Sequence, residues 1–107
     1  IWIDNNFSID ATDLYIIIGN TIDNAIEACS NIKDTEKRII NISLTQKEHL
    51  LLYEVNNPYI SDIKIHSKKP FHGYGLTNVR NCVERNNGTM TIDKTNDIFS
   101  ISIILNV

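Results

Sequence analysis

The chain has 107 residues, of which 42% are apolar and 21% are charged, and this composition is ordinary for one small globular domain. Its net charge of −3 argues against a general nucleic-acid-binding surface, because affinity for a phosphate backbone depends on clustered Lys and Arg. No apolar run approaches the roughly 20 residues that cross a bilayer, and the first residues lack the zones of a signal peptide, so we expect a soluble piece of a longer protein.

The first half of the chain predicts a short strand, a long helix and a hairpin. Ile1 to Ile3 is typical of a strand, and Asp10 or Thr12 is suited to cap the helix that follows, from about residue 13 to residue 31. After a polar turn, residues 38–46 and 50–55 predict two strands joined through residues 47–49. Apolar side chains at helical spacing define the inner face of the helix: Leu14, Ile17, Ile18, Ile22, Ala25, Ile26 and Cys29.

The second half predicts a long loop, a helix and a closing hairpin. Residues 56–72 lose the periodicity and contain both prolines, which indicates a loop of the kind that often covers a binding site. A second helix starts at Gly75 or Thr77 and stops at Asn87-Gly88, and strands follow over residues 89–93 and 98–107. This order favours a two-layer α/β sandwich, in which helices cover a mixed, mostly antiparallel sheet.

A polar stripe lies on the otherwise apolar first helix. Asn20, Asn24 and Glu27 fall on successive turns of one face, with Asp23 beside them. The carboxamide oxygen of Asn24 suits Mg²⁺, which takes hard oxygen ligands and shares them with nucleotide phosphates. Asn20 could orient a phosphate or a water, but an amide accepts a proton poorly, so water activation there should be weak. The alternative is that these are ordinary polar residues of an exposed helix face.

Two glycines precede the second helix, within residues 72–79 (HGYGLTNV). Gly73 and Gly75 permit close approach of a ligand, and the helix start offers backbone N–H groups and a positive dipole end, so phosphate is the expected guest. Neither a P-loop nor a dinucleotide-binding glycine pattern is present. Loops also use glycine for purely conformational reasons, so this pattern alone is weak.

The histidines and cysteines show no metal-binding spacing. His49 and His66 are typical loop residues, whereas His72 adjoins the glycines. Cys29 and Cys82 fall in the predicted helices without a CxxC pattern, so we expect buried, reduced thiols, which suit a reducing cytosol.

Taken together, these motifs resemble the GHKL ATPase/kinase superfamily and, within it, the catalytic ATP-binding domain of sensor histidine kinases, over about residues 13–107. Residues 20–28 resemble the N-box and residues 72–79 the second glycine box, and residues 87–89 resemble the turn after its helix. The wording NAIEA with HGYGLTNV is most similar to the Agr-type peptide-pheromone receptor kinases. The resemblance implies a Bergerat-type ATP-binding fold over residues 1–107, with ATP and Mg²⁺ as cofactors.

The resemblance also implies individual roles. Asn24 would bind Mg²⁺ and Asn20 would lie beside the triphosphate, and these two residues form the implied catalytic pair. Lys68 and Lys69 would help to neutralise the phosphates. The implied cofactor-binding residues are Asn20, Asn24, Glu27, Asn57, Lys69, His72, Gly73, Gly75 and Leu76.

The first glycine box, DxGxG in the family, departs from the pattern. The matching segment, residues 53–59, reads YEVNNPY, so Asn57 stands at the aspartate position, with Asn56 as the alternative, and both glycines are missing. An asparagine can accept a hydrogen bond from the adenine amino group, but this bond is weaker than one to a charged aspartate. We therefore expect weak or lid-dependent ATP affinity.

The implied reaction is transfer of the ATP γ-phosphoryl group to a histidine in a separate dimerisation domain of the same parent protein, since these residues include no phosphoacceptor hairpin. We expect a homodimeric membrane receptor with this part in the cytoplasm, a response regulator downstream and a role in quorum sensing. Two alternatives remain open. One is a GHKL serine kinase or hydrolase, against which Asn20 counts, and the other is a degenerate nucleotide-sensing or dimerisation module, which the missing glycines favour.

Overall fold

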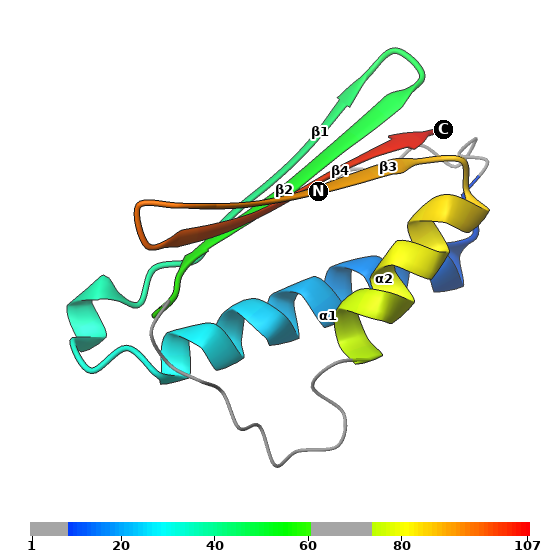
Figure 1. The fold of residues 1–107 in the computed structure, drawn as a ribbon. Helices are drawn as coiled ribbons and strands as arrows, with labels where there is room; N and C mark the ends of the chain where they lie inside the picture. The colour runs from blue at the N-terminus through cyan, green and yellow to red at the C-terminus, as the bar shows by residue number, and fades with distance from the viewer. Residues whose placement is uncertain (1–8, 61–73) are drawn as a thin grey trace.

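The computed structural model describes residues 9–60 and 74–107 (Figure 1). The predicted strand at Ile1–Ile3 and residues 61–72 of the predicted loop lie outside the described residues. The elements follow in the order α1 (Ala11–Ser30), η1 (Thr35–Lys37), β1 (Asn41–Lys47), β2 (Leu50–Pro58), α2 (Tyr74–Arg85), β3 (Thr89–Thr95) and β4 (Ile98–Asn106).

The four described strands form one sheet in the order β1-β2-β4-β3. Every neighbouring pair among them is antiparallel, in line with the predicted mostly antiparallel sheet. Both helices lie on the same face of this sheet (Figure 1). The predicted two-layer α/β sandwich is therefore confirmed, with an open antiparallel sheet in the described part of the chain.

Strand β2 is longer than predicted and carries on through Asn56 and Asn57 to Pro58. These residues pair with Ser100, Phe99 and Ile98 of β4. The sequence Asn-Asn-Pro reads as a turn, but proline is tolerated at a strand end, and pairing with an apolar neighbour strand overrides the weak local preference. The prediction that the loop begins at residue 56 is thus wrong by three residues.

Helix α1 begins two residues earlier than predicted, and Asp10 is its cap, with its Oδ1 accepting from Thr12 N at 2.8 Å. Its buried face repeats every four residues and carries Ile17, Thr21 and Ala25. Ile26, which the apolar pattern assigned to the inner face, is 54% exposed, because α1 rests on the sheet along a narrower stripe. Neither described helix has the length and apolarity that a membrane crossing requires.

The core lies between α1, α2 and the two central strands. Alternate residues of β2 and β4 face the helices and pair across the sheet, as Tyr53 does with Ile103 and Val55 with Ile101. Cys29 and Cys82 are free and buried, as predicted, and burial raises the pKa of both thiols. The buried apolar set is Ile9, Ile17, Ala25, Leu51, Tyr53, Val55, Val79, Cys82, Val83, Ile101, Ile103 and Leu105.

Candidate functional site

The two helices run antiparallel and meet at two places. Near the start of α1, Asp13 contacts the last turn of α2 through Arg85. Near the start of α2, Gly75 lies beside Asn20, where an added Cβ would come 4.0 Å from the Asn20 Cβ. The amide-bearing helix and the glycine-bearing helix start therefore converge, as expected of two segments that the resemblance assigns to one ATP site.

Asn24 and Glu27 continue the Asn20 face of α1 toward its C-terminal end. They lie one and about two turns beyond Asn20, which corresponds to roughly 6 and 10 Å along the axis. Both side chains are half-buried, while Asp23 is exposed. The C-terminal half of α1 extends past the start of α2 (Figure 1), so the polar stripe starts at the helix–helix contact and continues beyond it.

At the end of β2, the two asparagines take opposite faces of the sheet. Asn57 is only 1% exposed and continues the helix-facing series of Tyr53 and Val55, with its Nδ2 donating to Pro58 O at 2.9 Å. Asn56 points to the other face, where its Nδ2 donates to Glu54 Oε1 at 2.9 Å. Of the two, Asn57 is the one on the same side of the sheet as the polar stripe of α1.

A buried hydroxyl pair, Thr21 and Tyr53, connects α1 to β2. Thr21 Oγ1 lies 2.7 Å from Tyr53 OH, and it is also within donating distance of Ile17 O at 2.8 Å and Ile18 O at 3.0 Å. A hydroxyl has one hydrogen, so when Thr21 donates to the backbone it accepts from Tyr53. Burial raises the pKa of the Tyr53 phenol. Sequence reasoning missed this pair, although a threonine among the apolar positions of α1 was a signal for it.

Several predicted site residues are not described by the structure: Lys68, Lys69, His72 and Gly73. Leu76 is half-buried in the first turn of α2 and packs on the core, and His49 is exposed between β1 and β2. Among residues 9–60 and 74–107, no group of three His, Cys, Asp or Glu side chains could hold a metal ion.

Comparison with protein-family models matches residues 9–106 to the GHKL domain. The chain belongs to the GHKL family. This confirms the resemblance to the GHKL superfamily, while the finer likeness to Agr-type receptors stays a prediction.

The fold of this GHKL domain is similar to that of the Acinetobacter baumannii histidine kinase AdeS. The TM-score is 0.63 at 20% sequence identity, over 91% of this chain and 47% of that chain. The GHKL domain thus spans about half the length of that kinase chain, and at this identity the likeness shows a shared fold. The comparison with curated proteins returned no match.

The donor set of this GHKL domain fits a metal-bound polyphosphate. The Asn24 carboxamide offers a neutral hard oxygen of the type that Mg²⁺ accepts, half-buried on the stripe that starts at Asn20. The first turn of α2, beginning beside Asn20, presents N–H groups without partners within the helix and the positive end of the helix dipole. Neutral amides and N–H groups can hold an anion without adding negative charge next to it.

Proposed function

We propose that this chain is the ATP-binding catalytic domain of a two-component sensor histidine kinase, which transfers the γ-phosphoryl group of ATP to a histidine in a separate dimerisation domain. The observation that carries the proposal is the meeting of Asn20 with Gly75, at the point where the amide stripe of α1 reaches the start of α2. Membership of the GHKL family supplies the ATP-binding part of this proposal.

Each residue then has a defined task. Asn24 would hold Mg²⁺, which on binding neutralises charge on the phosphates. Asn20 would orient the triphosphate without accepting a proton, so that transfer is favoured over hydrolysis. Gly75 and Leu76 would bring the N–H groups of α2 to the phosphates, and Asn57 would accept a hydrogen bond from the adenine amino group.

The remaining residues and partners of the proposal rest on the sequence motifs. Glu27, Lys69, His72 and Gly73 would complete the nucleotide site. The motif wording supports an Agr-type peptide-pheromone receptor as the parent, hence a homodimeric membrane protein with this domain in the cytoplasm. A response regulator would receive the phosphoryl group, in quorum sensing.

The replacement Asn24→Ala tests the metal assignment. We expect calorimetry to detect Mg²⁺-dependent ATP binding to the wild type, and Asn24→Ala to lose it, because the carboxamide oxygen is removed. Asn81→Ala, which changes an exposed asparagine of α2, is the matched control and should bind like the wild type. An unchanged affinity of Asn24→Ala would remove Asn24 from the site.

Phosphoryl transfer separates the kinase from its alternative. The alternative is a degenerate nucleotide-sensing module, which the replacement of the first glycine box by Asn57-Pro58-Tyr59 favours. The experiment incubates the domain with ATP labelled at the γ-phosphate and a histidine-bearing helical hairpin domain. Label on the histidine supports the kinase, whereas ATP binding without any transfer to that histidine supports the sensing module.

A further inference from the structure

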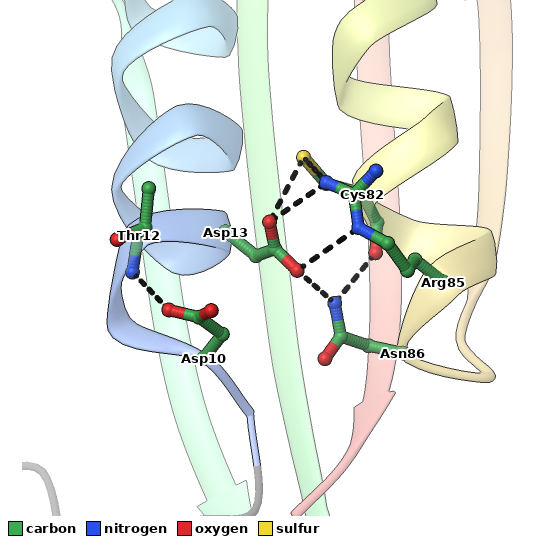
Figure 2. Close-up of polar contacts among 6 residues, drawn as sticks. All are labelled: Asp10, Thr12, Asp13, Cys82, Arg85 and Asn86. Atoms are coloured by element: carbon green, nitrogen blue, oxygen red, sulfur yellow. Dashed lines mark hydrogen bonds and ion pairs between the residues drawn. The ribbon is translucent and has the colours of Figure 1, made fainter.

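A polar cluster joins the start of α1 to the end of α2 (Figure 2). Gly75 lies at the other end of α2, in its first turn. Asp13 is 8% exposed and accepts three hydrogen bonds from nitrogen donors. Its Oδ1 accepts from Arg85 Nη2 at 2.8 Å, and its Oδ2 accepts from Arg85 Nε at 3.3 Å and from Asn86 Nδ2 at 2.9 Å. The carboxylate therefore accepts a bidentate pair of hydrogen bonds from the guanidinium and a third hydrogen bond from the carboxamide.

The cluster is also tied to the backbone of α2. Asn86 Nδ2 donates to Cys82 O at 2.7 Å as well as to Asp13, so the carboxamide bridges the two helices. The Cys82 thiol completes the cluster, 3.6 Å from Asp13 Oδ1 and 3.2 Å from Arg85 Nη2. The acid sits in the first turn of its helix and the base in the last turn, where each also interacts favourably with the helix dipole.

The spacing along the two helices connects this cluster to the proposed nucleotide site. Asp13 and Asn20 are seven residues apart in α1, and Gly75 and Cys82 are seven residues apart in α2. Because the helices run antiparallel, the contact of Asp13 with the end of α2 and the contact of Asn20 with Gly75 form two separate connections between the helices. They are roughly 10 Å apart along α1, and roughly 10 to 16 Å apart along α2, where the partners of Asp13 run from Cys82 to Asn86. Because helix turns are rigid, a shift of α2 along α1 at the Asp13 contact also shifts Gly75 relative to Asn20.

Between these two connections, the helices present apolar side chains such as Ile17 and Val79. Apolar packing is non-directional, so it favours contact without strongly fixing how far one helix slides along the other. Bidentate, charge-assisted hydrogen bonds impose a defined geometry. Of the described contacts between the helices, the Asp13 cluster is the one with this property.

We propose that Asp13, Arg85 and Asn86 are positioning residues, which fix the axial register of α2 on α1 and thereby hold the start of α2 opposite Asn20. The inference rests on the proposed function, because it concerns how the phosphate-binding helix start is placed. It assigns no contact with nucleotide to the cluster itself. The cluster acts on the phosphates through Gly75, about three helical turns before Arg85.

The test uses two variants. Asp13→Asn keeps the size of the side chain and removes its charge. Arg85→Lys is a milder change, which keeps the positive charge and removes the bidentate guanidinium. Binding of Mg-ATP and of adenosine is followed by titration of backbone amide NMR signals, which report folding and affinity together. Arg80→Gln, at an exposed arginine of the same helix, is the control.

We expect the dissociation constant of Mg-ATP to rise about tenfold in Asp13→Asn and less in Arg85→Lys, with that of adenosine changing by less than about twofold, since only the phosphate end of the site is displaced. The Gly75 and Leu76 amide signals should also shift without nucleotide in both variants, and not in Arg80→Gln. Equal weakening of both ligands, or unchanged Gly75 signals, would overturn the positioning role. A wild type that binds neither ligand would instead refute the proposed function, while the nucleotide-free shifts still decide the register.

Discussion

Gly88 lies directly beside the backbone of β4, just after the end of α2. A Cβ added there would come 2.6 Å from Ile104 O and 2.8 Å from Leu105 Cδ2, and the carbonyl cannot rotate away as a flexible side chain would. We expect Gly88→Ala to lower the free energy of unfolding by about 1–3 kcal/mol, as overpacking does elsewhere. Urea denaturation measures this loss.

Gly19 provides the matched comparison for Gly88. A Cβ added at Gly19 would meet no atom within 4 Å, and the residue lies inside α1, so Gly19→Ala should raise stability by about 0.5–1 kcal/mol. Two glycine-to-alanine changes in one small domain thus have opposite expected signs. A stabilised Gly88→Ala variant would contradict the close approach to β4.

The Thr21–Tyr53 pair predicts strongly non-additive behaviour. Thr21→Val leaves the Tyr53 hydroxyl buried without its hydrogen-bond partner, which should lower the free energy of unfolding by about 1–3 kcal/mol. Adding Tyr53→Phe removes the orphaned hydroxyl, so the double variant should lose less than the sum of the two single variants. The check is a double-mutant cycle by chemical denaturation, and additive losses would show that the hydrogen bond has little energetic weight.

The end of α2 shows how local hydrogen bonds stop a helix. The N–H of Gly88 bonds to Val83 O at 2.8 Å and that of Asn87 to Glu84 O at 3.0 Å, which is the Schellman arrangement. The sequence predicted a stop at Asn87-Gly88, but Asn87 takes the left-handed conformation, with φ 57°. The glycine is required for the approach of β4, and the asparagine makes the turn.

The pairing of α1 with α2 should depend on pH through Asp13. The hydrogen bonds from Arg85 and Asn86 hold the pKa of this carboxyl at about 2, below its usual 3.8. The unfolded chain therefore binds this proton more readily, so the contribution of the carboxylate to stability is complete above pH 3.8 and is lost as the pH falls through about 2.

Urea midpoints recorded between about pH 5 and pH 2 test this linkage. The midpoint of the wild type should fall toward the acid end, and the fall should be smaller in Asp13→Asn, which has no carboxyl to titrate at this position. Asp23→Asn, at an exposed acid of the same helix, should follow the wild type. Parallel curves for wild type and Asp13→Asn would contradict the assignment.

For the molecule as a whole, the two-layer sandwich followed from helical and strand periodicity, which are local signals. The meeting of Asn20 with Gly75, 55 positions apart, was expected only through the family resemblance, which assigns both residues to one ATP site. The burial of Asp13 did not follow from local signals, since its partners Arg85 and Asn86 lie more than 70 positions along the chain. Likewise, the turn-like Asn57 becomes a strand residue only through its pairing with Phe99. What could not be predicted are side chains whose surroundings are assembled from distant segments.

Mg-ATP should stabilise the whole domain if it binds the native state alone. At a concentration of one hundred times the dissociation constant, the expected gain is about 2.7 kcal/mol, and the thermal midpoint should rise with nucleotide concentration. Because Asn57 lacks the charge of an aspartate, millimolar nucleotide should be needed for a large shift. Thermal unfolding with Mg-ATP, and with ATP plus a chelator, checks this expectation, and equal shifts in both would remove the metal from the site.

The connectivity has a consequence for how the chain reaches this structure. Residues 9–60 contribute one α-helix and one hairpin, and residues 74–107 contribute the same. The central β2–β4 pairing and the α1–α2 contact both join one half to the other. Neither half can enclose a hydrophobic interior alone, so each should stay unfolded until it finds its complement. The folding rate should then be limited by contact between two halves that are distant in the sequence. If the chain were cut between the halves, the two fragments should still associate.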